Sequence, residues 1–141
     1  LDGLSEERLD LRLKIHKFNS CSPDKKDEMK AMIKDIVGKC GKDIFIEPPF
    51  HCDYGKNIEV GENFYANFNC VILDVGKVKI GNNVMFAPNV SIYTAGHPIH
   101  PESRNSGYLP LYTETCQFVR LECGTAHDRN LRLSNTLRYY L

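Results

Sequence analysis

The sequence predicts a mainly β protein in which short parallel strands coil around one core, behind a small helical layer. Two observations lead to this prediction. Six-residue units with an apolar first position repeat over residues 54–93. Ahead of them, apolar residues within residues 5–41 recur at helical spacing.

Two helices are expected within residues 5–41. The first presents a broad apolar stripe made of two neighbouring faces, with Leu9, Leu13 and His16 on one and Leu11, Ile15 and Phe18 on the other. Ser22-Pro23-Asp24 predicts the start of the second helix, because a serine cap, an early proline and an acidic first turn favour a helix N-terminus. Its apolar face comprises Met29, Met32, Ile33, Ile36 and Val37, and Gly38 or Gly41 ends it.

The six-residue repeat predicts strands that share one inward register. The first positions are Tyr54, Val60, Ala66, Ile72, Ile80, Phe86 and Ile92, and the second inward positions are Ile58, Phe64, Cys70, Gly76, Val84 and Val90. Tight corners tolerate asparagine in left-handed backbone conformations, and asparagine recurs at the fourth position in Asn57, Asn63, Asn83 and Asn89. An antiparallel sandwich is the alternative, but hairpin turns would not keep a six-residue register for so long.

The composition changes near Gly107. All eleven lysines lie at or before Lys79, and the six-residue register stops. We therefore expect three parts: a helical region over residues 1–42, a partial coil over 43–107 and a divergent tail over 108–141.

Charge and composition limit the function. Eighteen basic and eighteen acidic side chains cancel, so nothing indicates a nucleic-acid partner or an anionic membrane surface. No apolar run is long enough to span a bilayer, and the first residues do not read as a secretory signal. The six cysteines form no CxxC pair, which argues against a zinc ribbon and predicts free thiols in the cytoplasm.

Several motifs occur together in one order. They are Pro48-Pro49-Phe50-His51-Cys52-Asp53-Tyr54-Gly55, Asn63-Phe64-Tyr65-Ala66-Asn67-Phe68-Asn69, Ile72-Leu73-Asp74, Ala87-Pro88-Asn89-Val90, Gly96-His97-Pro98 and Arg104-Asn105-Ser106-Gly107. With them, residues 4–107 resemble the maltose/galactoside O-acetyltransferase family, which includes nodulation-type acetyltransferases. The resemblance implies a left-handed parallel β-helix of triangular section behind a helical layer. It also implies a homotrimer with active sites between subunits, and acetyl transfer from acetyl-CoA to a hydroxyl of a maltose-, glucose- or galactoside-type sugar, without a metal.

Two residues match the reacting centre of that family. His97 matches the catalytic histidine, and its near-neutral ordinary pKa suits a general base that removes the proton of a sugar hydroxyl. Asn67 matches an asparagine that faces the reacting centre and could assist a developing oxyanion. The alternatives for His97 are a loop histidine bound to a backbone carbonyl and a metal pair with His100. The alternative for Asn67 is an ordinary corner residue.

Three further residues match acceptor contacts of the family: Asp53, Tyr65 and Arg8. One branch of the family has serine where this chain has Asp53, so the acceptor is left open. A solvated helix face is the alternative for Arg8.

The tail creates a second functional hypothesis. In the family, later coils that grip CoA follow Arg104-Asn105-Ser106-Gly107, and we expect residues 108–141 to replace them, through a deletion, an altered exon or a shifted frame. An uncovered coil exposes a strand edge, which Leu109, Leu111, Tyr112, Phe118, Val119 and Leu121 could cover. The alternative to an acetyltransferase is therefore a non-catalytic remnant that binds a sugar or pairs with intact subunits.

Overall fold

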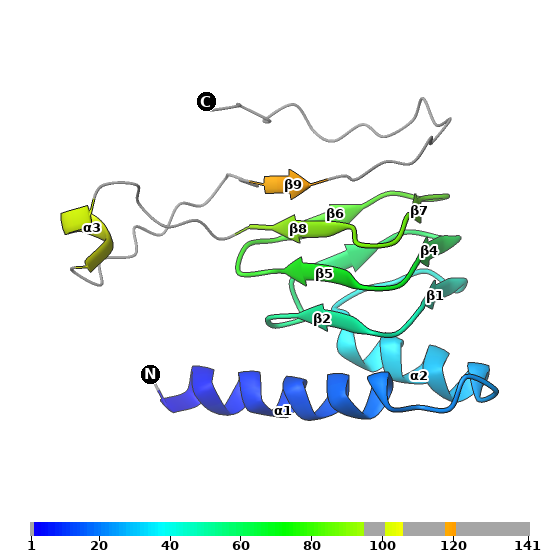
Figure 1. The fold of residues 1–141 in the computed structure, drawn as a ribbon. Coiled ribbons are helices and arrows are strands. Elements are labelled where there is room, and N and C mark those ends of the chain that lie inside the picture. The colour runs from blue at the N-terminus through cyan, green and yellow to red at the C-terminus, as the bar shows by residue number, and fades with distance from the viewer. Residues whose placement is uncertain (1, 95–100, 106–117, 121–141) are drawn as a thin grey trace.

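The computed structural model describes residues 2–94, 101–105 and 118–120. Helices α1 (Asp2–Asn19) and α2 (Lys26–Ile36) lie at one end of a stack of short strands (Figure 1). The strands are β1 (Ile44–Ile46), β2 (Phe50–Cys52), β3 (Ile58–Val60), β4 (Phe64–Ala66), β5 (Cys70–Leu73), β6 (Val78–Ile80), β7 (Met85–Phe86) and β8 (Ser91–Tyr93). The five-residue helix α3 (Pro101–Asn105) and strand β9 (Phe118–Arg120) follow.

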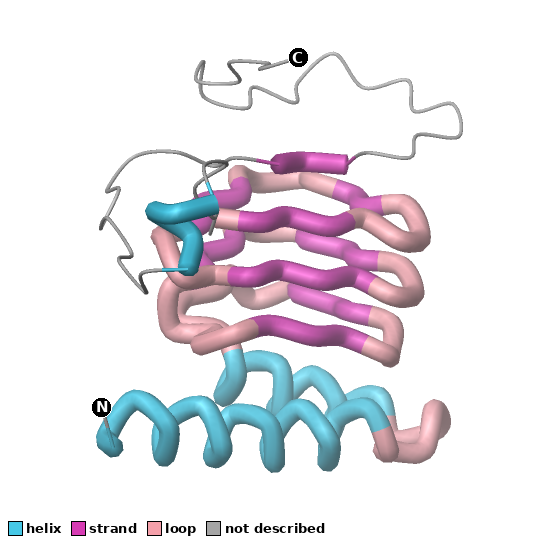
Figure 2. The backbone as a smooth tube through the Cα atoms, turned by 60° about the vertical axis from the view of Figure 1, so that its left-hand side comes forward, coloured by secondary structure: helices cyan, strands magenta, loops and turns pink. Residues whose placement is uncertain are grey.

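Three parallel sheets form the sides of the stack, so the predicted coil is confirmed and the antiparallel sandwich is wrong. The parallel strands are ordered β1-β4-β7, β2-β5-β8 and β3-β6. Ile44 lies beside Phe64 and Ile58 lies beside Val78, so one full coil advances the chain by 20 residues. Figure 2 shows these coils lying one above another over the two helices.

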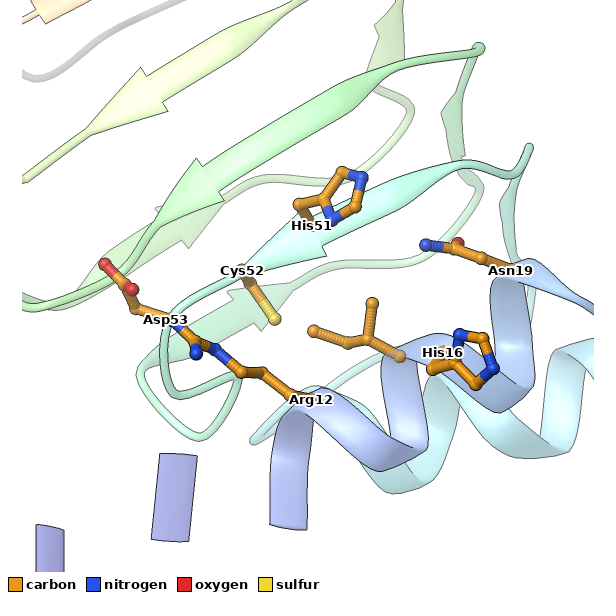
Figure 3. A pocket seen from close by; sticks show the side chains of 7 residues that line it. Arg12, His16, Asn19, His51, Cys52 and Asp53 are labelled. Atoms are coloured by element: carbon orange, nitrogen blue, oxygen red, sulfur yellow. The ribbon is translucent and has the colours of Figure 1, made fainter. Parts of the chain in front are cut away.

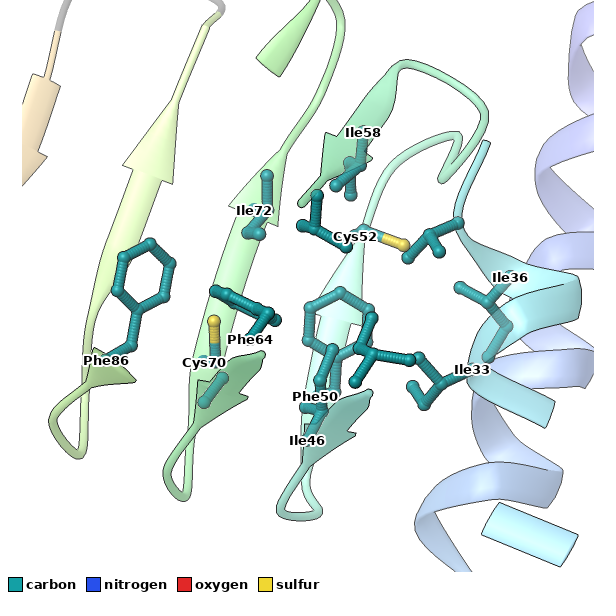
Figure 4. Close-up of a cluster of buried hydrophobic side chains, with 14 of the residues drawn as sticks. Ile33, Ile36, Ile46, Phe50, Cys52, Ile58, Phe64, Cys70, Ile72 and Phe86 are labelled. Carbon is teal, nitrogen blue, oxygen red and sulfur yellow. The ribbon is translucent and has the colours of Figure 1, made fainter. Parts of the chain in front are cut away.

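The core runs through the middle of the coil and into the helices (Figure 4). Strand residues alternate between buried and partly exposed, as period-two side chains of a half-buried sheet should. Phe64 and Phe86 meet edge-on with ring centroids 5.2 Å apart, which joins successive coils through an aromatic contact. The side chains buried along the coil are Ile44, Ile46, Phe50, Cys52, Ile58, Val60, Phe64, Ala66, Cys70, Ile72, Val78, Phe86, Val90 and Ile92.

The coil turns two kinds of corner. At narrow corners the flanking inward residues stand four positions apart, as for Val60 and Phe64. The first narrow corner comprises residues 47–49, 67–69 and 87–90, and the second comprises residues 61–63 and 81–84. At the wide corner, residues 53–57 and 74–77, the inward residues stand six apart, as for Cys52 and Ile58.

The wide corner makes part of the predicted register wrong. Tyr54 is not an inward first position, because two additional residues precede Ile58, and buried Cys52 takes that place. Gly76 likewise lies in the corner, and Val78 is the buried residue. The strands of the coil begin at Ile44, ten residues before Tyr54, where the repeat becomes visible in the sequence.

Asparagine turns the narrow corners. Asn63, Asn69, Asn83 and Asn89 have φ between 54° and 64°, a left-handed conformation that asparagine tolerates better than most residues. Their side chains also pair one coil apart, since Asn63 Nδ2 donates to Asn83 Oδ1 at 2.8 Å. The prediction is confirmed for three of the four asparagines, but not for Asn57, which has no positive φ.

Helix α1 covers the first coil with part of its predicted stripe. Leu11, Ile15 and Phe18 are buried, whereas Leu9 and Leu13 are 59% and 62% exposed. The Asn19 amide donates to the Phe50 carbonyl at 3.0 Å and accepts from the Phe50 N–H at 2.9 Å. One side chain thus replaces a neighbouring strand at the lower edge of β2.

Helix α2 begins three residues later than expected. The Ser22 hydroxyl bonds to the Asp24 carboxylate, and the Lys25 N–H donates to the Ser22 carbonyl at 3.0 Å in a turn. That turn uses the serine that was expected to cap the helix, and no side chain caps α2. After α2, Lys39 pairs with Glu59 and provides a lower neighbour for β3.

At the other end, β9 pairs antiparallel with β8, so part of the upper edge is covered by Phe118–Arg120. Leu109, Leu111, Tyr112 and Leu121, also expected to cover this edge, lie outside the described residues. Among the helices of the described part, none has both the length and the apolar content to cross a membrane.

Candidate functional site

The wide corner is organised around a buried carboxylate. Asp74, directly after β5, is fully buried. Its Oδ1 accepts the backbone N–H groups of Asp53 and Tyr54, both at 2.9 Å. The Asp74 carbonyl accepts a bond from Asn57 Nδ2 at 2.7 Å. The upper loop of the corner therefore holds both ends of the lower loop, 53–57.

Two of the sequence-predicted residues meet at this corner. Arg8 Nη2 of α1 lies 2.6 Å from Asp53 Oδ1, with the aspartate 16% exposed and the arginine 41% exposed. The Arg8 guanidinium also lies over the Tyr54 ring, 5.6 Å from its centroid, and Lys56 lies 5.9 Å from that ring. Lys56 in turn pairs with Glu7 of α1. Arg8 is therefore not simply a solvated helix residue: charge and aromatic contacts fix α1 to the corner.

A hollow of about 390 Å³ lies beside Asp53, the acidic partner of Arg8 (Figure 3). Helix α1 lines it with Arg12, Ile15, His16 and Asn19, and the segment of β2 and the wide corner lines it with His51, Cys52 and Asp53. Burial, followed by the carboxylates of Asp74 and Asp53, raises the pKa of the Cys52 thiol, so this group is neutral near pH 7. The hollow presents hydrogen-bonding groups on both walls, which suits a small polar ligand.

Tyr65 lies on a different side of the coil. It occupies the outward position of β4 and stacks on Phe45 with ring centroids 6.4 Å apart and planes 6° apart. Burial, followed by the charge of the nearby Glu47 carboxylate, raises the pKa of Tyr65. Its sheet, β1-β4-β7, is the side that does not adjoin the wide corner.

Asn67 lies at the first narrow corner, directly after β4. Its N–H donates to the Phe86 carbonyl at 3.0 Å, and its Oδ1 accepts the Phe68 N–H at 2.8 Å. The side-chain oxygen is therefore engaged locally, and the amide NH₂ is the group left to donate to a ligand. The structure thus brings Arg8 and Asp53 together, and it leaves Tyr65 and Asn67 on other elements.

His97 lies outside the described residues, as does His100. Thr94 is the last described residue before His97 in the sequence, and its Oγ1 accepts the Gly76 N–H at 2.7 Å and donates to the Leu73 carbonyl at 2.8 Å. Thr94 is therefore anchored at the upper level of the wide corner. Within residues 2–94, 101–105 and 118–120, no group of three or more metal-ligating side chains is placed to hold a metal ion.

Sequence reasoning gave no role to Asp74. The sequence does place an acidic residue directly after the apolar residues of β5, and the structure shows that this residue is buried. A buried acid is unusual unless its oxygens are used, so this position marks a constrained corner.

The comparisons with known proteins agree with this architecture. Residues 2–41 match the family described as "Maltose acetyltransferase hexapeptide capping motif". The galactoside O-acetyltransferase of Escherichia coli is 42% identical over 108 residues, which are 77% of this chain and 53% of that protein.

Two solved structures superimpose well. A maltose O-acetyltransferase from Clostridium difficile gives a TM-score of 0.74 at 46% identity, over 76% of this chain and 57% of that one. A galactoside acetyltransferase in complex with coenzyme A gives 0.73 at 41% identity, over 76% and 54%. The chain spans about half the length of the curated relatives it matches. Over the part that these comparisons cover, the chain belongs to the maltose and galactoside O-acetyltransferase family of hexapeptide-repeat proteins.

Proposed function

We propose that this chain works as an O-acetyltransferase that moves acetyl from acetyl-CoA to a sugar hydroxyl. The relatives named above act on maltose or galactosides, and one was solved with coenzyme A, which supports this donor and this class of acceptor. The proposal includes the left-handed winding of the family and a cytoplasmic location, for which the free thiols of Cys21, Cys40, Cys52 and Cys70 give support.

One observation carries the proposal: the fold joins Arg8 and Asp53, 45 residues apart in the sequence, beside a polar hollow. A carboxylate held by a guanidinium still has lone pairs for ligand hydroxyls, and the guanidinium still has donors. Such a pair can bind two neighbouring hydroxyls of a sugar, which is what an acceptor site needs.

The reaction itself is a direct transfer. The sugar oxygen attacks the thioester carbonyl while His97 accepts the hydroxyl proton. The carbon–sulfur bond then breaks, the proton passes to the CoA thiolate, and the products are a sugar acetate and CoA thiol. The Asn67 NH₂ would donate to the oxyanion that develops on the carbonyl.

Two copies of the chain are needed to complete this site. Arg8 and Asp53 lie at the wide corner, whereas Tyr65 lies on the side of the coil that does not adjoin it. That side carries an outward ladder of Phe45, Tyr65 and Met85, the last 74% exposed. We propose that this apolar side packs against the wide corner of a neighbouring copy in a homotrimer, so that each site takes residues from two copies.

The direct test is transfer of labelled acetyl from acetyl-CoA to glucose, maltose and a methyl galactoside, measured by mass spectrometry. His97→Ala should lower turnover by about 10²–10⁴-fold, the usual contribution of a general base. His127→Ala, at a histidine with no assigned role, is the control. Equal turnover in the two variants would remove His97 from the mechanism. Absence of CoA binding in calorimetry, with sugar binding retained, would favour the binding module instead.

Complementation tests the shared site. Asp53→Asn and Asn67→Ala chains should each be nearly inactive as pure preparations. Co-expressed in equal amounts, they should regain about one quarter of wild-type activity, because random assembly pairs an intact Asp53 side with an intact Asn67 side at that frequency. Activity no higher than in the parent variants would place both residues in the same copy's site.

A further inference from the structure

A residue without any assigned role holds the acceptor side of the site. Asp74 binds the N–H groups of two consecutive residues, Asp53 and Tyr54, through a single oxygen, Oδ1. Two such bonds from one atom fix the orientation of the peptide between those residues. The direction in which the Asp53 side chain leaves the backbone is fixed with it.

The same kind of contact, a clasp in which a side-chain oxygen accepts a backbone N–H of the coil below, occurs at other places with different chemistry. Asn82 Oδ1 accepts the Glu62 N–H at 2.8 Å at the second narrow corner, and Thr94 Oγ1 accepts the Gly76 N–H at 2.7 Å. An amide or a hydroxyl is therefore sufficient to close a corner of this coil. A carboxylate also serves where Glu62 Oε2 accepts the Lys42 N–H at 2.7 Å, but Glu62 is exposed. Among these four clasps, only the one above Asp53 uses a buried carboxylate.

That carboxylate is costly to keep. Asp74 is fully buried, and its Oδ2 has no hydrogen-bond partner among the residues that the structure describes. A buried acid with an unbonded oxygen loses hydration without full compensation. The gain is at Oδ1, because hydrogen bonds to an ionised acceptor are roughly twice as strong as neutral ones.

We propose that Asp74 is a positioning residue for the acceptor: it holds the Asp53 backbone so that the Asp53 carboxylate faces both Arg8 and the sugar. The proposal rests on the acetyltransferase function proposed above. Asp74 does not touch the substrate, so its removal should weaken binding of the sugar and leave binding of acetyl-CoA unchanged.

The test compares Asp74→Ala, Asp74→Asn and Asn82→Ala in the full chain. Asp74→Ala should raise the sugar KM by about tenfold, as loss of one good hydrogen bond would, with the acetyl-CoA KM within about twofold. Asp74→Asn keeps an acceptor oxygen without the charge and should recover most of the sugar affinity. Asn82→Ala removes the equivalent neutral clasp at a corner without site residues, so it should lower the Tm but leave both KM values unchanged.

A second readout does not depend on turnover. The amide protons of Asp53 and Tyr54 should exchange with solvent about tenfold faster or more in Asp74→Ala than in wild type, with Asp74→Asn between them. In Asn82→Ala, of these three amide protons only that of Glu62 should exchange with solvent faster than in wild type. If Asp74→Ala does not fold, the KM values and the amide exchange rates are compared between Asp74→Asn and wild type.

The outcomes separate the two proposals. If the wild type transfers no acetyl group, the acetyltransferase proposal fails, and the sugar Kd from an NMR titration replaces KM in the test of Asp74. An equal rise of both KM values, or a loss of Tm with unchanged sugar affinity, would show that Asp74 is only structural. Unchanged exchange of the Asp53 and Tyr54 amides would also overturn the proposal.

Discussion

The wide corner and the second narrow corner turn the same coil in different ways. At the narrow corner, asparagines with positive φ lie 20 residues apart and pair with each other, and their side chains are exposed. At the wide corner, a buried acid, an ion pair and a cation–aromatic contact replace that repeat. Both helices also contact the wide corner, α1 through Arg8 and α2 through the close approach of the Ile36 carbonyl to Gly55.

This difference separates the residues that shape the coil from those of the candidate site. A narrow corner needs only a residue that tolerates a left-handed conformation, so its sequence repeats from coil to coil. Additional residues at the wide corner break the repeat and allow polar side chains from separate segments to meet. We therefore expect substitutions at the wide corner to have larger and more specific effects than matched substitutions at the narrow corner.

The largest contrast should come from two glycines. Gly55 has φ +68°, and a Cβ there would lie 2.1 Å from the Ile36 carbonyl oxygen. Gly55→Ala should therefore lower the free energy of unfolding by about 3 kcal/mol or more, from backbone strain and a backbone clash together. A Cβ on Gly81 would meet nothing within 4 Å, so Gly81→Ala should change stability by less than about 0.5 kcal/mol. Urea unfolding measures both, and equal losses would remove the contrast.

The buried thiols of Cys70 and Cys52 should make the free energy of unfolding depend on pH. Burial raises the pKa of Cys70 from 9.0 to about 12. Between these values the unfolded chain loses the thiol proton and the folded chain keeps it, so stability falls as the pH rises. The slope attributable to this group is about 1.4 kcal/mol per pH unit. Urea unfolding of Cys70→Ala should fall less steeply than wild type above about pH 9, and parallel profiles would contradict the prediction. Cys52 should behave similarly, with the nearby carboxylates of the wide corner adding to the effect of burial.

The asparagine at the narrow corner should matter through its backbone. Asn83 has φ 57°. Asn83→Ala should cost about 1–2 kcal/mol, because alanine is strained in this conformation. Asn83→Gly relieves that strain and should lose only the exposed bond to Asn63, a fraction of that amount. Thermal unfolding compares the two, and an equal loss would assign the effect to the side-chain pair.

The smallest stability effect should come from the ion pair between Arg8 and Asp53. Arg8 is 41% exposed, so Arg8→Met should lower the free energy of unfolding by at most about 1 kcal/mol. Lys30→Met, which removes a pair with Asp43 at 3.1 Å, is a matched control and should behave alike. A loss of several kcal/mol in Arg8→Met alone would mean that the pair is structural.

Much of the fold follows from the sequence because it repeats. Val60, Ala66 and Phe86 were correctly placed in the core from spacing alone. The predicted register was wrong at Tyr54. Counting six residues back from Val60 leads to Tyr54, whereas the buried residue before the wide corner is Cys52. The spacing shows two additional residues between Ile72 and Ile80, but the same addition one coil earlier, between Cys52 and Ile58, was missed.

The site depends on contacts that a local pattern does not contain. Arg8 and Asp53 were identified by resemblance, and their ion pair required a helix to lie across the first coil. Asp74 was missed because an acid after an apolar strand normally predicts an exposed turn, whereas Asp74 is fully buried here. Ser22 was misjudged because its hydroxyl had a closer partner in Asp24 than the backbone of α2.

The account depends on the wide corner being the place where a sugar binds. A titration of the isotope-labelled chain with maltose and with a methyl galactoside tests this directly by NMR. The account predicts that amide shifts concentrate in residues 53–57 and 74–77 and in α1 near Arg8, and that Arg8→Met weakens the titration. Shifts confined to residues 61–63 and 81–84, with the wide corner unchanged, would contradict it.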